Sequence, residues 1–207
     1  MTGTATRYLY LARHGEALPD ESGLSEQGRR QAALLGRRLA SRPISAVRHG
    51  PLPRAAQTAR LIAESLPGAP LVASETAGDY VPHFPDREEL PPDCADFLLT
   101  FLSHSSAEDR RRGPTLARRA LEQFTGPVAG DQERHELVVT HNFLVGWLVR
   151  DAMEAPKWRW LGLNHGNAAL TVIRYTPGRP TTVLVHNDMR HLPTELTWTG
   201  FPPDTRL

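Results

Sequence analysis

The sequence contains very little cysteine and very little lysine. Cys94 is its single cysteine, so neither an internal disulfide nor a metal cage built from cysteines is possible. Lys157 is its single lysine, so guanidinium groups carry nearly all of the positive charge. Guanidinium presents a planar fork that matches phosphate oxygens. The cation content therefore suits a protein that handles phosphate.

The sequence also lacks long apolar runs and a charge excess of either sign. No stretch approaches the roughly 20 apolar residues that a membrane-spanning helix needs. The apolar run 8–12 is too short for the core of a signal peptide. The formal net charge of +1 does not favour nucleic acid as a partner. We therefore expect no membrane and no nucleic-acid partner, and we expect the protein in the cytoplasm.

Short apolar segments alternate with helical patterns along most of the 207 residues. This alternation predicts a three-layer α/β/α sandwich with a mostly parallel central sheet, in a single domain over residues 1–207. Ser25 is a candidate cap for the first helix, and Pro53 is tolerated in the first turn of the second. Strands are predicted at 8–12, 44–47, 137–140, 168–175 and 181–185. Helices are predicted after Ser25, with an apolar face at Ala32, Leu34, Leu35 and Leu39, at about 52–66 and at 143–153.

The stretch 78–130 breaks the alternation. It begins with a loop rich in proline and continues with two helical patterns, near 93–102 and 114–124. We interpret it as an insertion that covers the functional site.

Three places in the chain bring polar side chains to the ends of predicted strands. Arg13 and His14 follow the first strand, and His141 follows the strand 137–140. Arg54 lies where the second strand leads into a helix, and free N–H groups at a helix start attract anions. Because ligands bind beyond the carboxyl ends of strands in such sheets, we expect these residues in one anion site.

These residue types suit transfer of a phosphoryl group. Neutral imidazole attacks phosphorus when one ring nitrogen is free and the other is oriented by a hydrogen bond. The leaving group also needs a proton donor, and a carboxyl beside a covered pocket stays protonated because burial raises its pKa. Glu75 and Asp79 are the two candidates for this donor. The nine histidines are scattered without a helical metal-binding spacing, so no metal site is expected.

Several motifs occur in an order that resembles the histidine phosphatase (phosphoglycerate-mutase-like) superfamily. They are Leu11-Ala-Arg-His-Gly-Glu16, Leu24-Ser-Glu-Gln-Gly28, Pro51-Leu-Pro-Arg-Ala-Ala-Gln-Thr-Ala59, His141 and Asn167-Ala-Ala-Leu-Thr171. The resemblance spans most of the chain and is weakest over 76–136. It implies a phosphoglycerate-mutase-like fold and a phosphohydrolase that needs neither metal nor cofactor.

The resemblance also implies roles for individual residues. His14 would attack phosphorus and become phosphohistidine, and Arg13, Arg54 and His141 would hold the phosphoryl oxygens. Glu75 matches the proton donor of the family. Members often carry an asparagine that touches phosphate shortly after the first motif, and the stretch 17–22 has none.

Thr76 decides between the branches of the family that the sequence resembles. The mutase branch places an arginine directly after the acidic glutamate, whereas Thr76 follows Glu75 here. The segments 140–146 and 160–164 are similar to the branch of phosphoprotein phosphatases. We therefore predict a phosphomonoester hydrolase acting on a phosphoprotein or a small phosphorylated metabolite. The alternatives are a phosphoglycerate-type mutase and a non-catalytic protein that binds a phosphorylated ligand. The oligomeric state does not follow from the sequence.

Overall fold

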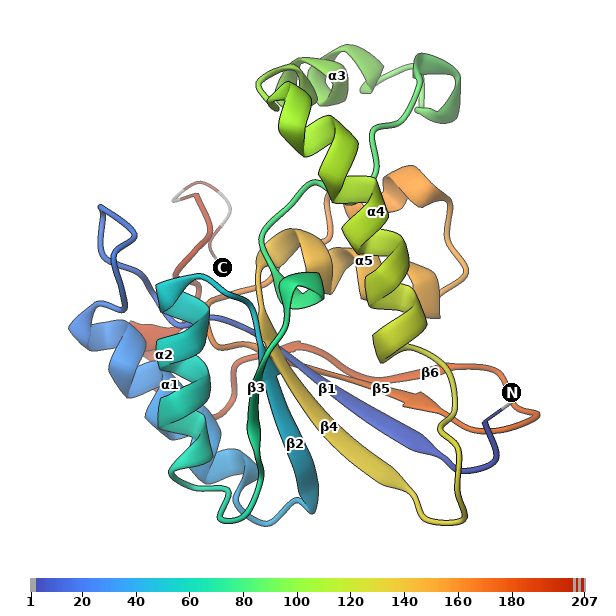
Figure 1. Ribbon diagram of the computed structural model, residues 1–207. Helices are drawn as coiled ribbons and strands as arrows, with labels where there is room; N and C mark the ends of the chain where they lie inside the picture. Colours follow the sequence, from blue (N-terminus) through green and yellow to red (C-terminus); the bar gives the residue numbers. More distant parts are fainter. Residues whose placement is uncertain (1–2, 203, 205, 207) are drawn as a thin grey trace.

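The computed structural model describes residues 3–202, 204 and 206, which form one six-stranded sheet (Figure 1). The strand order is β3-β2-β4-β1-β5-β6. Neighbouring strands are parallel from β3 through β1, and β5 runs antiparallel to both β1 and β6. The strands are β1 (Arg7–Arg13), β2 (Ile44–His49), β3 (Leu71–Ala73), β4 (Arg134–Thr140), β5 (Leu170–Tyr175) and β6 (Thr182–Asp188).

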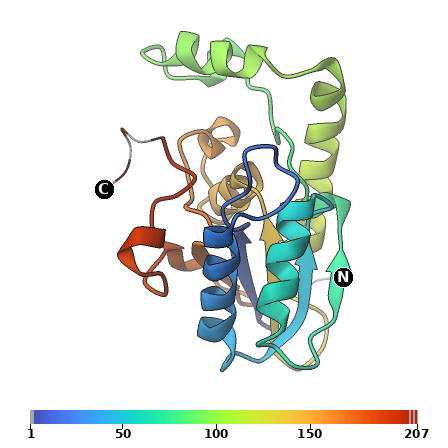
Figure 2. The ribbon, with the colours of Figure 1, turned by 90° about the vertical axis from the view of Figure 1, so that its left-hand side faces the viewer.

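Helices cover both faces of the sheet, as Figures 1 and 2 show. Tyr10 and Ala12 of β1 pack in one hydrophobic cluster with α1 and α2, whereas Leu9 and Leu11 pack in the other with α4 and α5. This alternation follows from the two-residue period of a strand. The predicted three-layer sandwich is confirmed. The helices are α1 (Glu26–Leu39), α2 (Pro53–Ala63), α3 (Ala95–Ser103), α4 (Ala107–Phe124) and α5 (Asn142–Ala152).

Local sequence signals account for most of these elements. The Ser25 hydroxyl accepts a hydrogen bond from the Gly28 N–H at 3.0 Å and so caps α1. Pro53 stands in the first turn of α2, where its missing N–H costs nothing. β3 was not predicted, because its three residues are partly or largely exposed and show no apolar alternation. It forms by pairing with β2. Among the described residues there are also the short 3₁₀ helices η1 (Glu75–Ala77), η2 (Arg87–Glu89), η3 (Lys157–Trp160) and η4 (Thr194–Leu196).

The stretch 78–130 divides into two structurally different parts. The second half of α4 belongs to the core, because Ala117, Ala120 and Phe124 are buried against the sheet layer. α4 begins well before Pro114, at a capping box in which the Asp109 backbone N–H donates a hydrogen bond to the Ser106 hydroxyl. Pro114 lies inside the helix and removes one backbone hydrogen bond there. α3, in contrast, projects away from the sheet (Figure 1).

The helices of the described residues include none that is both long and apolar enough to cross a membrane. The single domain over 1–207 remains a prediction, and residues 1–2, 203, 205 and 207 lie outside the described part of the chain.

Candidate active site

The ends of β1 and β4 bring two histidines together. The strands are parallel neighbours, with Arg13 opposite Thr140, so the residues that follow them leave the sheet side by side. The backbone N–H of His14 donates to the Thr140 carbonyl at 2.9 Å. The rings of His14 and His141 have centroids 5.1 Å apart. Both line a cavity of about 450 Å³, which Arg13, Arg54, Asp79 and Asn167 also line.

Hydrogen bonds fix the tautomer of His14. Its Nδ1 lies 2.7 Å from the Gly15 carbonyl, which only accepts, so Nδ1 carries the proton. Its Nε2 lies 3.2 Å from Nε of Arg54, which only donates, so Nε2 keeps its lone pair. Burial, with His141 and Arg13 nearby, lowers the pKa of His14 well below 6.5. The side chain is therefore neutral at pH 7, with Nε2 unprotonated beside Arg54 in the lining of the cavity.

Arg54 contacts His14 and two carboxylates. It lies in the first turn of α2 and is buried. Besides its contact with His14, its Nη1 donates to Glu21 at 3.0 Å and its Nη2 donates to Asp79 at 2.8 Å. A phosphoryl group that binds this guanidinium therefore competes with Glu21 for the Nη1 donor of Arg54.

Arg13 is held by backbone carbonyls from the C-terminal part of the chain. Its Nη1 donates to the carbonyl oxygens of His165 at 2.8 Å and Gly200 at 3.0 Å. Gly200 has φ +84°, and a Cβ there would collide with Arg13 and with Asn167. Two neutral acceptors fix the guanidinium without neutralising its charge, so the charge remains available for an anion in the cavity.

His141 is buried with no hydrogen-bond partner for either ring nitrogen among the described residues. Its Nδ1 lies 3.4 Å from Oδ2 of Asp79. Burial, with the charges of Arg54 and Arg13, lowers its pKa to about 3. A neutral imidazole has one N–H donor, and leaving that donor unpaired in the interior is costly. A phosphoryl oxygen in the cavity is a suitable acceptor for it.

The two candidate proton donors differ clearly in position. Glu75, which matched the family's donor in sequence, forms an ion pair with Arg112 at 2.6 Å and lines a neighbouring cavity instead. Asp79 lines the cavity of His14 and contacts Arg54 and His141. Its side chain is 37% exposed, yet the surrounding protein raises the pKa of the carboxyl above 3.8 despite the opposing charge of Arg54. The geometry thus favours Asp79 over Glu75.

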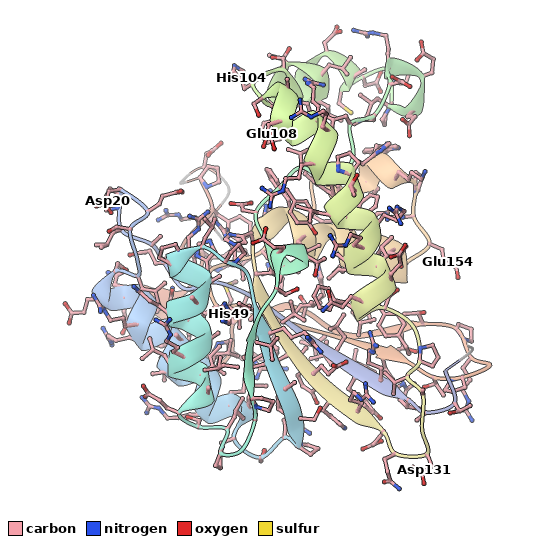
Figure 3. The ribbon with its side chains drawn as sticks, viewed as in Figure 1. Asp20, His49, His104, Glu108, Asp131 and Glu154 are labelled. Atoms are coloured by element: carbon pink, nitrogen blue, oxygen red, sulfur yellow. The ribbon has the colours of Figure 1, made fainter. Side chains whose placement is uncertain are left out.

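Sequence reasoning missed two residues that contact this machinery. Glu21 lies in the stretch 17–22, which was noted only because it lacks asparagine, and it reaches Arg54 from the loop whose tip carries Asp20 (Figure 3). Asn167 belongs to a recognised motif but had no assigned role, and its Nδ2 donates to the His14 carbonyl at 2.9 Å. The asparagine was visible in the motif, whereas Glu21 gave no signal.

Substituting Glu21 with glutamine is expected to tighten the binding of inorganic phosphate about two- to fivefold. The neutral amide competes less strongly than a carboxylate for Nη1 of Arg54. An ion pair whose carboxylate is largely exposed, as that of Glu21 is, contributes up to about 1 kcal/mol. Competitive inhibition of aryl phosphate hydrolysis by phosphate measures the change. Glu26→Gln, on an exposed residue of the nearby α1 helix, is the control. An unchanged inhibition constant in Glu21→Gln would contradict the competition.

Lowering the pH from 7 to 5 is expected to lower the melting temperature. Burial holds the pKa of His141 and of His165 at about 3, so both stay neutral in the fold but take up protons near pH 6.5 when unfolded. Stability is therefore complete above pH 6.5 and falls below it, by up to about 1.4 kcal/mol per pH unit for each histidine. Thermal unfolding of His165→Asn should show a shallower pH dependence, and the exposed His104→Asn should match the wild type. Equal slopes in all three proteins would refute this assignment.

The described residues contain no group of three or more His, Cys, Asp or Glu side chains that could hold a metal ion. The guanidinium groups that line this cavity are those of Arg13 and Arg54.

Known proteins are similar to this chain in sequence. The model of the histidine phosphatase superfamily (branch 1) matches residues 9–188. The "Serine/threonine-protein phosphatase Pgam5, mitochondrial" of Caenorhabditis briggsae is 29% identical over 95% of this chain and 68% of its own length. The Homo sapiens protein of that name is 24% identical over 91% of this chain and 65% of its own length. The chain thus spans about two thirds of the length of these curated relatives.

Solved structures share the fold at low sequence identity. Mycobacterial hydrolase 2 has a TM-score of 0.67 and 20% identity, and covers 92% of this chain and 94% of its own. The alpha-ribazole phosphatase from Shigella flexneri has a TM-score of 0.61 and 19% identity, over 87% of this chain and 96% of its own. The family resemblance, the phosphoglycerate-mutase-like fold and, at the level of the family, the phosphatase class predicted from the sequence are confirmed.

The expected cytoplasmic location is wrong by the same comparison, because the curated relatives are named as mitochondrial proteins. The expectation rested on the lack of a recognisable targeting pattern. The residues that build the fold and the site carry no information about the compartment.

Proposed function

The chain belongs to the histidine phosphatase superfamily, and we propose that it hydrolyses phosphomonoesters through a phosphohistidine formed on His14. The observation that carries the proposal is the state of His14: a buried neutral imidazole whose Nε2 is unprotonated and accepts a hydrogen bond from Nε of Arg54. Arg13, Arg54 and His141 surround it with positive charge and an N–H donor. This combination suits attack on phosphorus and the binding of phosphoryl oxygens.

The first step forms the phosphoenzyme. The phosphoryl oxygens bind Arg13, Arg54 and His141, and the phosphate displaces Glu21 from Nη1 of Arg54. Nε2 of His14 then attacks phosphorus, and the bond from phosphorus to the ester oxygen breaks. The electron pair stays on that oxygen, which takes a proton from Asp79. The raised pKa of Asp79 favours the protonated form that this step needs.

The second step returns the enzyme to its starting state. The Asp79 carboxylate accepts a proton from a water molecule, and the oxygen of that water attacks the phosphorus of the phosphohistidine. The bond from phosphorus to Nε2 breaks, and its electron pair restores the lone pair of His14. Inorganic phosphate leaves, and Glu21 returns to Arg54. Asp79 replaces Glu75 in our proposal because it contacts both Arg54 and His141.

We propose a phosphoprotein as the substrate. The support is that the curated relatives are named serine/threonine-protein phosphatases. A second support is that the cavity of about 450 Å³ has room for a phosphorylated side chain.

Trapping of the phosphoenzyme tests the proposed chemistry. The wild-type protein is mixed with a radiolabelled aryl phosphate and quenched in alkali, and the label on the protein is counted in the presence and absence of a chelator. We expect label that survives alkali and is lost in acid, as a phosphorus–nitrogen bond requires, with no effect of the chelator. Label that is stable in acid, or turnover that the chelator stops, would overturn the proposal.

A further inference from the structure

α3 carries an exposed aromatic face. Phe97 is 74% exposed and Phe101 is 47% exposed. They are four residues apart and therefore lie on the same side of the helix, whereas Leu102 is buried and holds the helix in place. Two phenyl rings exposed together on one helix face are unusual in a folded protein and indicate a binding surface. We refer to Phe97 and Phe101 as the aromatic arm.

The aromatic arm is continuous with the catalytic cavity. Phe101 meets Phe143 edge to face, with ring centroids 6.1 Å apart. Phe143 lines the cavity of His14 and packs against Trp160, with ring centroids 4.9 Å apart. Leu18 and Pro19 line the same cavity, so its polar floor is bordered by apolar side chains. A row of aromatic rings thus leads from the nucleophile to the arm.

The arm lies beyond the end of the sheet at which His14 is placed. α3 projects past that end in Figure 1, and in Figure 2 it extends above the loop between β1 and α1. His104, directly after α3, and Glu108, in the first turn of α4, mark the turn between these two helices in Figure 3. Phe143, which lines the cavity and contacts Phe101, connects the arm with the cavity.

We propose that the aromatic arm binds apolar side chains of a phosphopeptide, next to the phosphorylated residue. The inference rests on the proposed function and names the substrate class more closely. Four helical residues rise about 6 Å, which is about the distance between alternate residues of an extended chain. Phe97 and Phe101 therefore match two apolar side chains at alternate positions of an extended peptide. Phe143 contacts the part of the peptide nearest the phosphate.

Two matched phosphopeptides test the proposal. Both carry one phosphoserine; the first has leucine at two alternate positions beside it, and the second has serine at those positions. kcat/KM is measured by phosphate release for the wild type and for the double variant Phe97→Ala/Phe101→Ala. The wild type should prefer the leucine peptide, and the double variant should lose about tenfold of that preference, mainly through KM. Phe97 and Phe101 are exposed, so their removal leaves the core intact.

The controls separate this idea from its alternatives. Met153→Ala removes another exposed apolar side chain, 61% exposed and outside the cavity lining, and should keep the wild-type preference. An equal rate on both peptides in the wild type, or an unchanged preference in the double variant, would overturn the proposal. A loss of self-association in the double variant without a change in preference would do the same, by showing that the arm contacts a second copy. Failure of the proposed function is distinguishable, because His14→Ala would then still hydrolyse both peptides.

Discussion

The variant His14→Ala is expected to lose at least about a thousandfold of the phosphatase activity and to retain no phosphoryl label. The methyl group provides no lone pair, so the covalent route is closed, and groups that act as one catalytic unit rarely compensate for a missing nucleophile. Hydrolysis of an aryl phosphate, together with the labelling experiment, measures both effects. Circular dichroism verifies that the variant is folded.

His49 offers a matched control within the same chain. Arg48-His49-Gly50 repeats the residues Arg13-His14-Gly15, and Nδ1 of His49 lies 2.8 Å from the Gly50 carbonyl, as Nδ1 of His14 does from that of Gly15. His49 ends β2 (Figure 3) but does not line the catalytic cavity. His49→Ala should therefore stay close to the wild-type rate. If His14→Ala kept full activity, the phosphohistidine mechanism would be wrong.

The variant Asp79→Asn is expected to lower kcat about a hundredfold to ten-thousandfold on an alkyl phosphate, the usual contribution of a general acid. The amide keeps the size of the side chain and has no proton to transfer. Hydrolysis of the phosphoenzyme needs Asp79 with either substrate, so the contrast lies in kcat/KM, which reports formation of the phosphoenzyme. The loss of kcat/KM should be much smaller on p-nitrophenyl phosphate, because that leaving group departs as a stable anion. In the wild type, kcat on the alkyl phosphate should fall as the pH rises through the raised pKa of Asp79. Steady-state rates on both substrates across pH measure these differences.

Glu75→Gln is the matched comparison for Asp79→Asn. Glu75 and Arg112 are both more than half exposed, and such surface ion pairs contribute little. We expect a rate within about twofold of the wild type on both substrates, which corresponds to less than about 0.5 kcal/mol. A large loss in Glu75→Gln, with an active Asp79→Asn, would return the role of the proton donor to Glu75.

The sequence determined the parts of this protein that depend on local pattern and on sheet geometry. Short apolar segments predicted five of the six strands, and Ser25 and Pro53 indicated two helix starts. Arg13, His14 and His141 were expected together because parallel strands end at the same edge of a sheet. The structure brings them into one cavity with Arg54. These features were predictable because they need only neighbouring residues and one rule of topology.

The tertiary structure decided the contacts between residues that are distant in the chain. Arg13 donates a hydrogen bond to the carbonyl of Gly200, which is 187 positions away in the sequence. Arg54 donates to Glu21, which is 33 positions away. Neither residue has a local pattern that indicates its partner. Glu75 and Asp79 lie on one short segment, and only the turn at η1 determines which carboxylate faces the cavity. Side-chain direction in such a turn depends on what packs around it, so the sequence alone left the choice between the two open.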